Sequence, residues 1–131
     1  QFYCCDTIGA MAKTHGSVFL PVFEELVMPK LEDLVSEHAM SSDRKLGLFL
    51  IDDLLEHTGP AVAEAGWLES FLGALLAGTE CEDDEVRQAA VYGIGSAAST
   101  TGDAFAAYAR PACDALASIV AAHEHHVSEG G

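Results

Sequence analysis

The tripeptide Thr14-His15-Gly16 recurs as His57-Thr58-Gly59 and again as Thr100-Thr101-Gly102, at a constant spacing of 43 residues. Each copy closes a helical pattern of apolar residues and ends on glycine, which readily adopts the left-handed backbone found just after a helix. Three turns in the same phase are hard to obtain by chance. The chain is therefore predicted to repeat one helical unit along its length.

The same phase extends to both sides of the three turns. Apolar residues coincide before the turns at Ile8, Ile51 and Ile94, and after them at Phe19, Val62 and Phe105. A period in the low forties that is built from helices is the signature of HEAT and armadillo arrays, in which helix pairs stack on their neighbours. The predicted fold class is all-α, a HEAT-repeat α-α superhelix or solenoid.

Two amphipathic helices fit into each period, which gives about six antiparallel helices. They are expected at residues 2–15, 17–36, 42–57, 60–78, 84–100 and 103–122. The HEAT-repeat segment then covers residues 1–122, divided into a half repeat 1–16, a repeat 17–58, a repeat 59–101 and a half repeat 102–122. Residues 123–131 lose the apolar periodicity and are expected to form a flexible tail.

The composition narrows the range of partners. The chain has 131 residues, half of them apolar, and a formal net charge of −15 at neutral pH. A field of that sign repels phosphate backbones, so direct nucleic-acid binding is not expected. It attracts basic polypeptides, although an acidic surface that only keeps a protein in solution is a common alternative. The uncharged stretches are too short or too polar to cross a bilayer, so no membrane contact is expected.

The ends and the cysteines lead to two further expectations. The chain opens with Gln1 instead of methionine and reads as helix from its first residues. Because stacked repeats cut at both ends would leave unsatisfied faces, we expect a piece of a longer array. The four cysteines lack the spacing of a disulfide framework or a zinc site, which favours reduced thiols in a cytosolic or nuclear compartment.

Three segments resemble the importin-beta (karyopherin-beta) family of nuclear transport receptors. DDEVRQAAVYGIG at residues 83–95, followed by TGDAF at 101–105, is similar to the second helix of a HEAT repeat in that family and to its exit. FLIDDLLEH at 49–57 is similar to the preceding repeat, and PVFEELVMPKL at 21–31 resembles the first helix of that repeat. The likeness runs through most of residues 17–120 and is best to the branch that contains importins four and five.

The resemblance implies a function in nuclear import. Receptors of this family wrap basic protein cargo in their superhelix, release it on binding Ran-GTP, and cross the nuclear pore by touching Phe-Gly nucleoporins. It also implies that the second helix of each repeat faces the concave interior. The expected partners are basic cargo such as ribosomal proteins or histones, with Ran-GTP and the nucleoporins engaged through the full-length receptor. The expected localisation is cytoplasmic and nuclear, with shuttling between the two.

A candidate binding face follows from the helical pattern of residues 42–57. The buried stripe of this helix consists of Leu46, Leu50, Ile51 and Leu54. The residues left on or near the open face are Lys45, Phe49, Asp52, Asp53 and Glu56. The aligned open positions on the helix 84–100 are Gln88, Tyr92, Gly95, Ser96 and Ser99.

Within this face we expect cargo contacts from five residues: Phe49, Asp52, Asp53, Glu56 and Tyr92. Clustered carboxylates would attract lysine and arginine side chains of a basic cargo, and an aromatic ring beside them offers a cation–π contact. A solvated helix face with no partner is the alternative for any one of them. Arg44 and Arg87 are expected to brace adjacent repeats, and the aromatic residues of the outward helices are expected to pack in the core.

No enzymatic activity, cofactor or metal is expected. Some HEAT-repeat proteins bind two irons through facing His-Glu pairs, but the sequence offers one such pair, His123-Glu124, in the expected tail. Asp52 and Asp53 are adjacent and so diverge by about 100 degrees on a helix, which argues against a paired-carboxylate mechanism. The competing interpretation is a general HEAT-repeat scaffold or adaptor subunit for the assembly of protein complexes, whose partner need not be basic.

Overall fold

The computed structural model describes residues 2–36 and 38–130, and in this part of the chain every regular element is a helix. The α-helices are α1 (Phe2–His15), α2 (Leu20–Leu26), α3 (Met28–Leu34), α4 (Ser41–Glu64), α5 (Leu68–Gly78), α6 (Asp84–Thr100) and α7 (Ala109–Gly130). Two 3-10 helices, η1 (Gly16–Val18) and η2 (Gly102–Tyr108), follow α1 and α6. The all-α prediction is confirmed.

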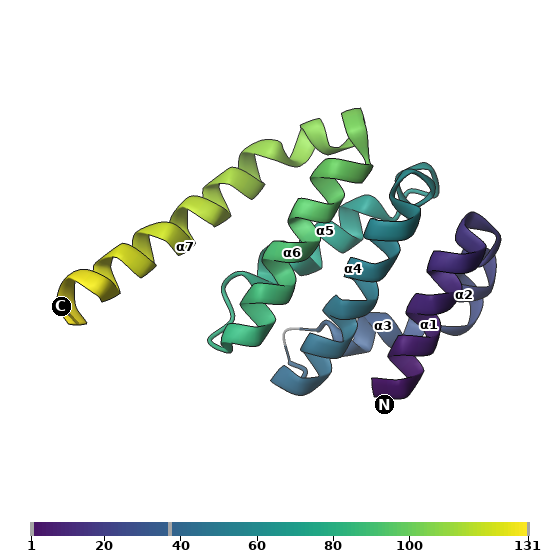
Figure 1. Cartoon of the computed structure of the whole chain (residues 1–131), viewed down its shortest axis with the longest axis horizontal. Coiled ribbons are helices and arrows are strands. Elements are labelled where there is room, and N and C mark those ends of the chain that lie inside the picture. Colours follow the sequence, from purple (N-terminus) through teal and green to yellow (C-terminus); the bar gives the residue numbers. More distant parts are fainter. Residues whose placement is uncertain (1, 37, 131) are drawn as a thin grey trace.

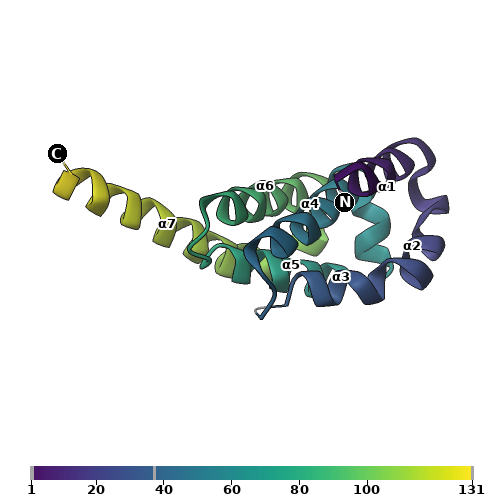
Figure 2. The ribbon, with the colours of Figure 1, turned by 90° about the horizontal axis from the view of Figure 1, so that it is seen from below.

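The helices form two layers. Helices α1, α4 and α6 lie side by side with their N-terminal ends at the same edge, and α4 packs against both neighbours (Figure 1). Helices α2, α3 and α5 lie behind them, as the second view shows (Figure 2). Helix α7 leaves the end of α6 and extends away from the other helices. We refer to α1, α4 and α6 as the front layer.

The helix expected at residues 17–36 is two helices instead of one. Its first residues form η1, and the chain bends at Val27, whose φ of −108° separates α2 from α3. Pro29 lies in the first turn of α3, where its missing N–H has no partner to lose. A proline at this position cannot continue the hydrogen bonds of α2, so the predicted single helix is wrong by one break.

The middle turn of the repeat also differs from the prediction. Gly16 and Gly102 have positive φ angles of 56° and 58°, as expected of residues that end a helix, but Gly59 does not. Here α4 is interrupted by a kink at Thr58 (φ −135°, ψ 27°), and it ends at Glu64, two residues before Gly66, whose φ is 85°. The non-helical backbone at Thr58 lies where the sequence predicts the helix 42–57 to end, so this boundary is confirmed, whereas the helix expected at 60–78 is interrupted again before α5 begins at Leu68.

Helix α6 approaches α4 closely at Gly59, which explains why a residue without a side chain lies at the kink. A Cβ atom on this glycine would lie 2.0 Å from the Thr100 hydroxyl oxygen, so α6 approaches the bare backbone here. The same hydroxyl lies 2.8 Å from the carbonyl oxygen of Leu55, which the kink leaves available as an acceptor. The Thr58 hydroxyl donates to the Leu54 carbonyl at 2.7 Å. These hydrogen bonds satisfy carbonyl groups at the kink.

The last expected helix, 103–122, begins as the 3-10 helix η2 and becomes α-helical only at Ala109. The helical backbone of α7 continues through Gly130, beyond the point where the apolar pattern ends. The flexibility expected of residues 123–131 stays a prediction, and so do the repeat boundaries and the superhelix.

The core lies between the two layers. Its largest fully buried side chains come from both layers: Phe23, Leu31, Leu48, Ile51, Leu54, Leu55, Leu72, Leu75, Val62 and Val86. Behind the front layer, the Phe23 ring lies 6.1 Å from the Trp67 ring, which lies 6.1 Å from the ring of Phe71. These aromatic contacts join α2 to α5, and they confirm that Trp67 and Phe71 pack in the core.

Small residues let α4 and α6 approach each other. A Cβ on Gly93 would lie 2.1 Å from Oδ1 of Asp52 and 2.5 Å from a methyl group of Leu75, whereas a Cβ on Gly95 would meet nothing within 4 Å. We expect Gly93→Ala to lower the free energy of unfolding by about 1–3 kcal/mol because the neighbours must move. Gly95→Ala, the matched control, should raise it by about 0.5–1 kcal/mol through helix propensity. Urea denaturation of both variants checks this, and equal effects would contradict the packing.

Candidate functional site

Helix α4 carries most of the predicted binding residues, and it lies in the front layer between α1 and α6. The four residues of the predicted buried stripe are all at most 5% exposed, which confirms that part of the pattern: Leu46, Leu50, Ile51 and Leu54. Phe49 is 39% exposed on α4 and Tyr92 is 54% exposed on α6. Two of the predicted cargo-binding residues therefore present aromatic surface to solvent.

Asp52 does not lie on the open face, contrary to expectation. Only 5% of the residue is exposed, and its Oδ1 atom has no hydrogen-bond partner among the described residues. The carboxyl group lies against α6 at Gly93, where the absence of a side chain leaves room for it. Burial raises its pKa to about 8, and the nearby carboxylates of Asp53 and Glu56 add to the shift. Asp52 is therefore mostly uncharged at neutral pH and cannot serve as an anionic contact for cargo.

Asp53 points the other way, toward α1. Its Oδ2 atom lies 2.5 Å from where a Cβ on Gly9 would be, so the carboxylate rests on the bare backbone of α1. The side chain is half-buried, and this desolvation raises the pKa of Asp53. His57 opposes the shift, whereas Glu56 and Asp6 add to it because like charges disfavour ionisation.

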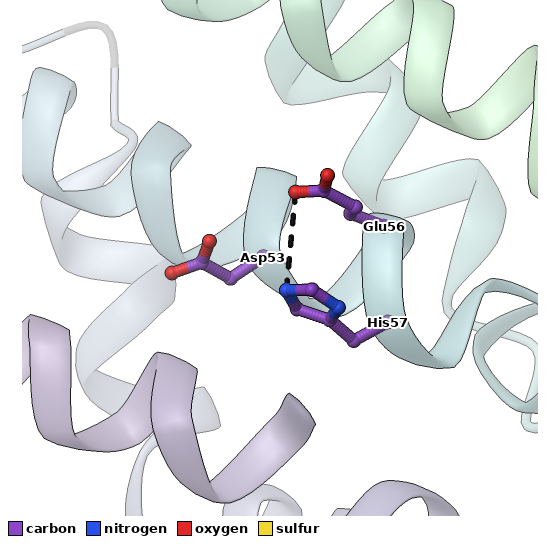
Figure 3. Close-up of side chains that lie close together, drawn as sticks. All are labelled: Asp53, Glu56 and His57. Carbon is purple, nitrogen blue, oxygen red and sulfur yellow. Dashed lines mark ion pairs between the residues drawn. The ribbon is translucent and has the colours of Figure 1, made fainter. Parts of the chain in front are cut away.

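Glu56 lies at the exposed centre of this face. Its interaction with the Tyr92 hydroxyl, across the gap between α4 and α6, raises the pKa of that phenol. On the other side, a Glu56 carboxylate oxygen lies 3.9 Å from Nε2 of His57 (Figure 3). The structure thus brings Glu56 and Tyr92 together, with Asp53 and Phe49 one turn and two turns before Glu56 on α4, and their role in cargo binding stays a prediction.

The arrangement suits a cationic side chain. Two carboxylates at partly exposed positions supply negative charge, and the adjacent exposed rings supply apolar and π surface. We call Phe49, Asp53, Glu56 and Tyr92 the acidic-aromatic face. It differs from the predicted set only by the loss of Asp52.

The two arginines occupy different environments. Arg87 donates to the Cys81 carbonyl at 2.7 Å and pairs with Asp84, and both partners belong to its own helix pair. These contacts brace the connection from α5 to α6. The expectation was that Arg87 would join adjacent repeats, and these contacts do not do so. Arg44 is half-buried in the first turn of α4, and the described residues show no ion pair for it. The cross-helix tie in the front layer comes from Lys45 and Glu85.

A group of potential metal ligands was missed in the sequence. Ligand atoms of Asp53, Glu56 and His57 all lie within 4.8 Å of one another. The spacing of i, i+3 and i+4 on a helix was the available signal, because it places three side chains on one side. The pair considered from the sequence, His123 and Glu124, has side chains outside the described residues.

Comparison with protein-family models gives no match for this sequence. Within residues 2–36 and 38–130, no helix has the length and apolar character needed to cross a bilayer.

Proposed function

We propose that this chain is part of a HEAT-type superhelical array that binds basic polypeptides through the acidic-aromatic face. The observation that carries the proposal is the position of Glu56, which interacts with the exposed Tyr92 of α6, with Asp53 and the exposed Phe49 on the preceding turns of α4. A row of parallel helices with open faces offers an extended surface to a polypeptide in the way that helical repeat arrays do.

The biological setting we propose is nuclear import. The supporting observation is the resemblance of residues 17–120 to importin-beta receptors, together with a net charge of −15 that favours encounter with basic proteins. In this setting the cargo is a histone or ribosomal protein, and Ran-GTP and Phe-Gly nucleoporins act on the full-length receptor. The alternative is a general scaffold subunit, which the two-layer arrangement of helices fits equally well.

Neutralising the acidic-aromatic face should weaken the capture of basic peptides. For Asp53→Asn combined with Glu56→Gln, we expect the affinity for a fluorescent Lys- and Arg-rich histone-tail peptide to fall about fivefold at low salt. Two partly exposed charge pairs contribute roughly 0.5 kcal/mol each, and 1.4 kcal/mol corresponds to a factor of ten. Fluorescence anisotropy at low and moderate salt measures the effect.

The matched control removes the same two charges from the other layer. Glu24 and Glu25 are exposed on α2, so Glu24→Gln with Glu25→Gln changes the net charge equally without touching the face. If both double variants bind the peptide alike, only the overall charge matters and the proposed face is wrong. Release of the captured histone by Ran-GTP, tested with the receptor that contains this segment, separates a transport receptor from a scaffold.

A further inference from the structure

Three neighbouring side chains of α4 form a group of potential metal ligands. Asp53 and His57 are one turn apart on the helix, Glu56 lies beside His57, and the ligand atoms of all three lie within 4.8 Å of one another (Figure 3). We propose that Asp53, Glu56 and His57 bind one divalent transition-metal ion of the zinc class. One imidazole nitrogen and two carboxylates are the protein ligands.

The ligand chemistry selects among metals. Histidine, aspartate and glutamate are all zinc ligands, three of them leave the fourth tetrahedral position open, and the imidazole suits nickel as well. Calcium and magnesium prefer shells made of oxygen alone, so these ions should bind weakly here. We therefore expect binding of zinc and no comparable binding of magnesium.

The distances between the three ligand groups are close to those required in a tetrahedral zinc site. Ligand atoms about 2.0–2.2 Å from a tetrahedral zinc ion lie roughly 3.3 Å from one another. The Nε2 atom of His57 and the nearest oxygen of Glu56 are 3.9 Å apart, so small side-chain rotations close the gap. Both side chains are partly exposed, with 26% and 44% of their surface accessible, which leaves them free to rotate and leaves an entry path for the ion.

Neighbouring helices hold two of the three ligands in place. The Asp53 carboxylate rests on Gly9 of α1, and Glu56 interacts with the hydroxyl of Tyr92 on α6. Partners outside the ligand set of a metal site commonly orient the ligands in this way. The site therefore depends on the packing of α1 and α6 against α4, and an isolated α4 peptide would lack these supports.

The charge balance favours a cation at this place. Asp53 and Glu56 repel one another, and Asp6 of α1 adds a third negative charge nearby. Lys45, the lysine of α4, is already paired with Glu85 at the far end of the helix. A divalent ion would relieve this repulsion. The inference does not require cargo binding, although Asp53 and Glu56 belong to both proposals, so a zinc ion and a basic polypeptide would compete for them.

Calorimetric titration of the full chain with zinc chloride, with magnesium chloride as comparison, tests the site. We expect binding of one zinc ion that His57→Ala weakens at least tenfold and Asp53→Asn weakens similarly. Zinc should also raise the melting temperature of the wild type but not that of His57→Ala. Because His57 is partly exposed, we expect His57→Ala without zinc to have the same melting temperature as the wild type without zinc. This comparison serves as the control that the variant is folded.

The matched control removes histidines elsewhere in the chain. His125→Ala with His126→Ala eliminates two imidazoles of the C-terminal segment and should leave zinc affinity unchanged. Zinc binding that survives His57→Ala, or that the His125→Ala and His126→Ala variant loses, would place the metal elsewhere and overturn the proposal. Absence of zinc binding to the wild type would overturn it as well.

Discussion

Asp52→Asn should raise the melting temperature by on the order of 10 °C at pH 9 and leave it nearly unchanged at pH 4. The carboxyl group is buried against Gly93, its Oδ1 has no partner among the described residues, and its pKa in the folded chain is about 8 against an ordinary value of 3.8. Asparagine keeps the shape of the side chain but cannot ionise. Thermal melts followed by circular dichroism between pH 4 and pH 9 measure the difference.

The sign of this pH dependence follows from proton binding. Well below pH 3.8 both the folded and the unfolded chain hold the Asp52 proton, so the group does not affect stability. As the pH rises toward 8, the unfolded chain releases the proton and the folded chain keeps it. The unfolded state therefore becomes more favourable, by on the order of a few kcal/mol at pH 8 and above. The wild type should lose this stability over the same interval, and Asp52→Asn should not.

An exposed acid provides the control for Asp52. Asp103 is exposed at the start of η2, so Asp103→Asn should melt like the wild type across the whole pH range. A constant offset between Asp52→Asn and the wild type from pH 4 to pH 9 would mean that ionisation of the buried carboxyl is not the cause. A melting temperature for Asp52→Asn below that of the wild type at pH 9 would contradict the raised pKa of the buried Asp52 carboxyl group.

Phe23→Ala should lower the free energy of unfolding by about 3–5 kcal/mol. The ring is fully buried and lies 6.0 Å from the ring of Phe19 and 6.1 Å from that of Trp67. Its removal leaves a cavity where α2 meets α5, so the contact between neighbouring helix pairs is weakened together with the core. Urea denaturation measures the loss as a lower transition midpoint.

The adjacent residue supplies the control for Phe23. Val22 lies on the same helix but is 49% exposed, so Val22→Ala should change the free energy of unfolding by no more than about 0.5 kcal/mol. Similar losses in the two variants would mean that α2 contributes through its helical backbone and not through the buried ring.

Local signals predicted most of the helices. Gly16 and Gly102 take the left-handed conformation because each only has to end the helix that precedes it. Gly59 has the same local sequence signal, yet it does not take the left-handed conformation, and its lack of a side chain instead leaves room for Thr100 of α6. The break at Val27 is absent from the apolar pattern, and Pro29 in the first turn of α3 is the local signal that marks it.

In the candidate site as well, some features could be predicted from the local sequence and others depended on contacts between helices. Periodicity identified the buried stripe of α4 and the exposed positions of Phe49, Glu56 and Tyr92, because a helix repeats its faces whatever its neighbours are. It could not separate Asp52 from Asp53. Both lie near the boundary of the stripe, and their environments depend on where α6 and α1 happen to approach α4.

The amino-acid sequence by itself determined the all-helical class, the acidic charge and which face of α4 is buried, since these depend on composition and on periodicity along one helix. Only the packed structure decided that Asp52 is buried beneath Gly93, that Asp53 rests on Gly9, and that ligand atoms of Asp53, Glu56 and His57 lie within 4.8 Å of one another. The burial of a carboxyl group and the support of a ligand depend on distances between helices. Those distances follow from side chains far apart in the chain, so no local pattern encodes them.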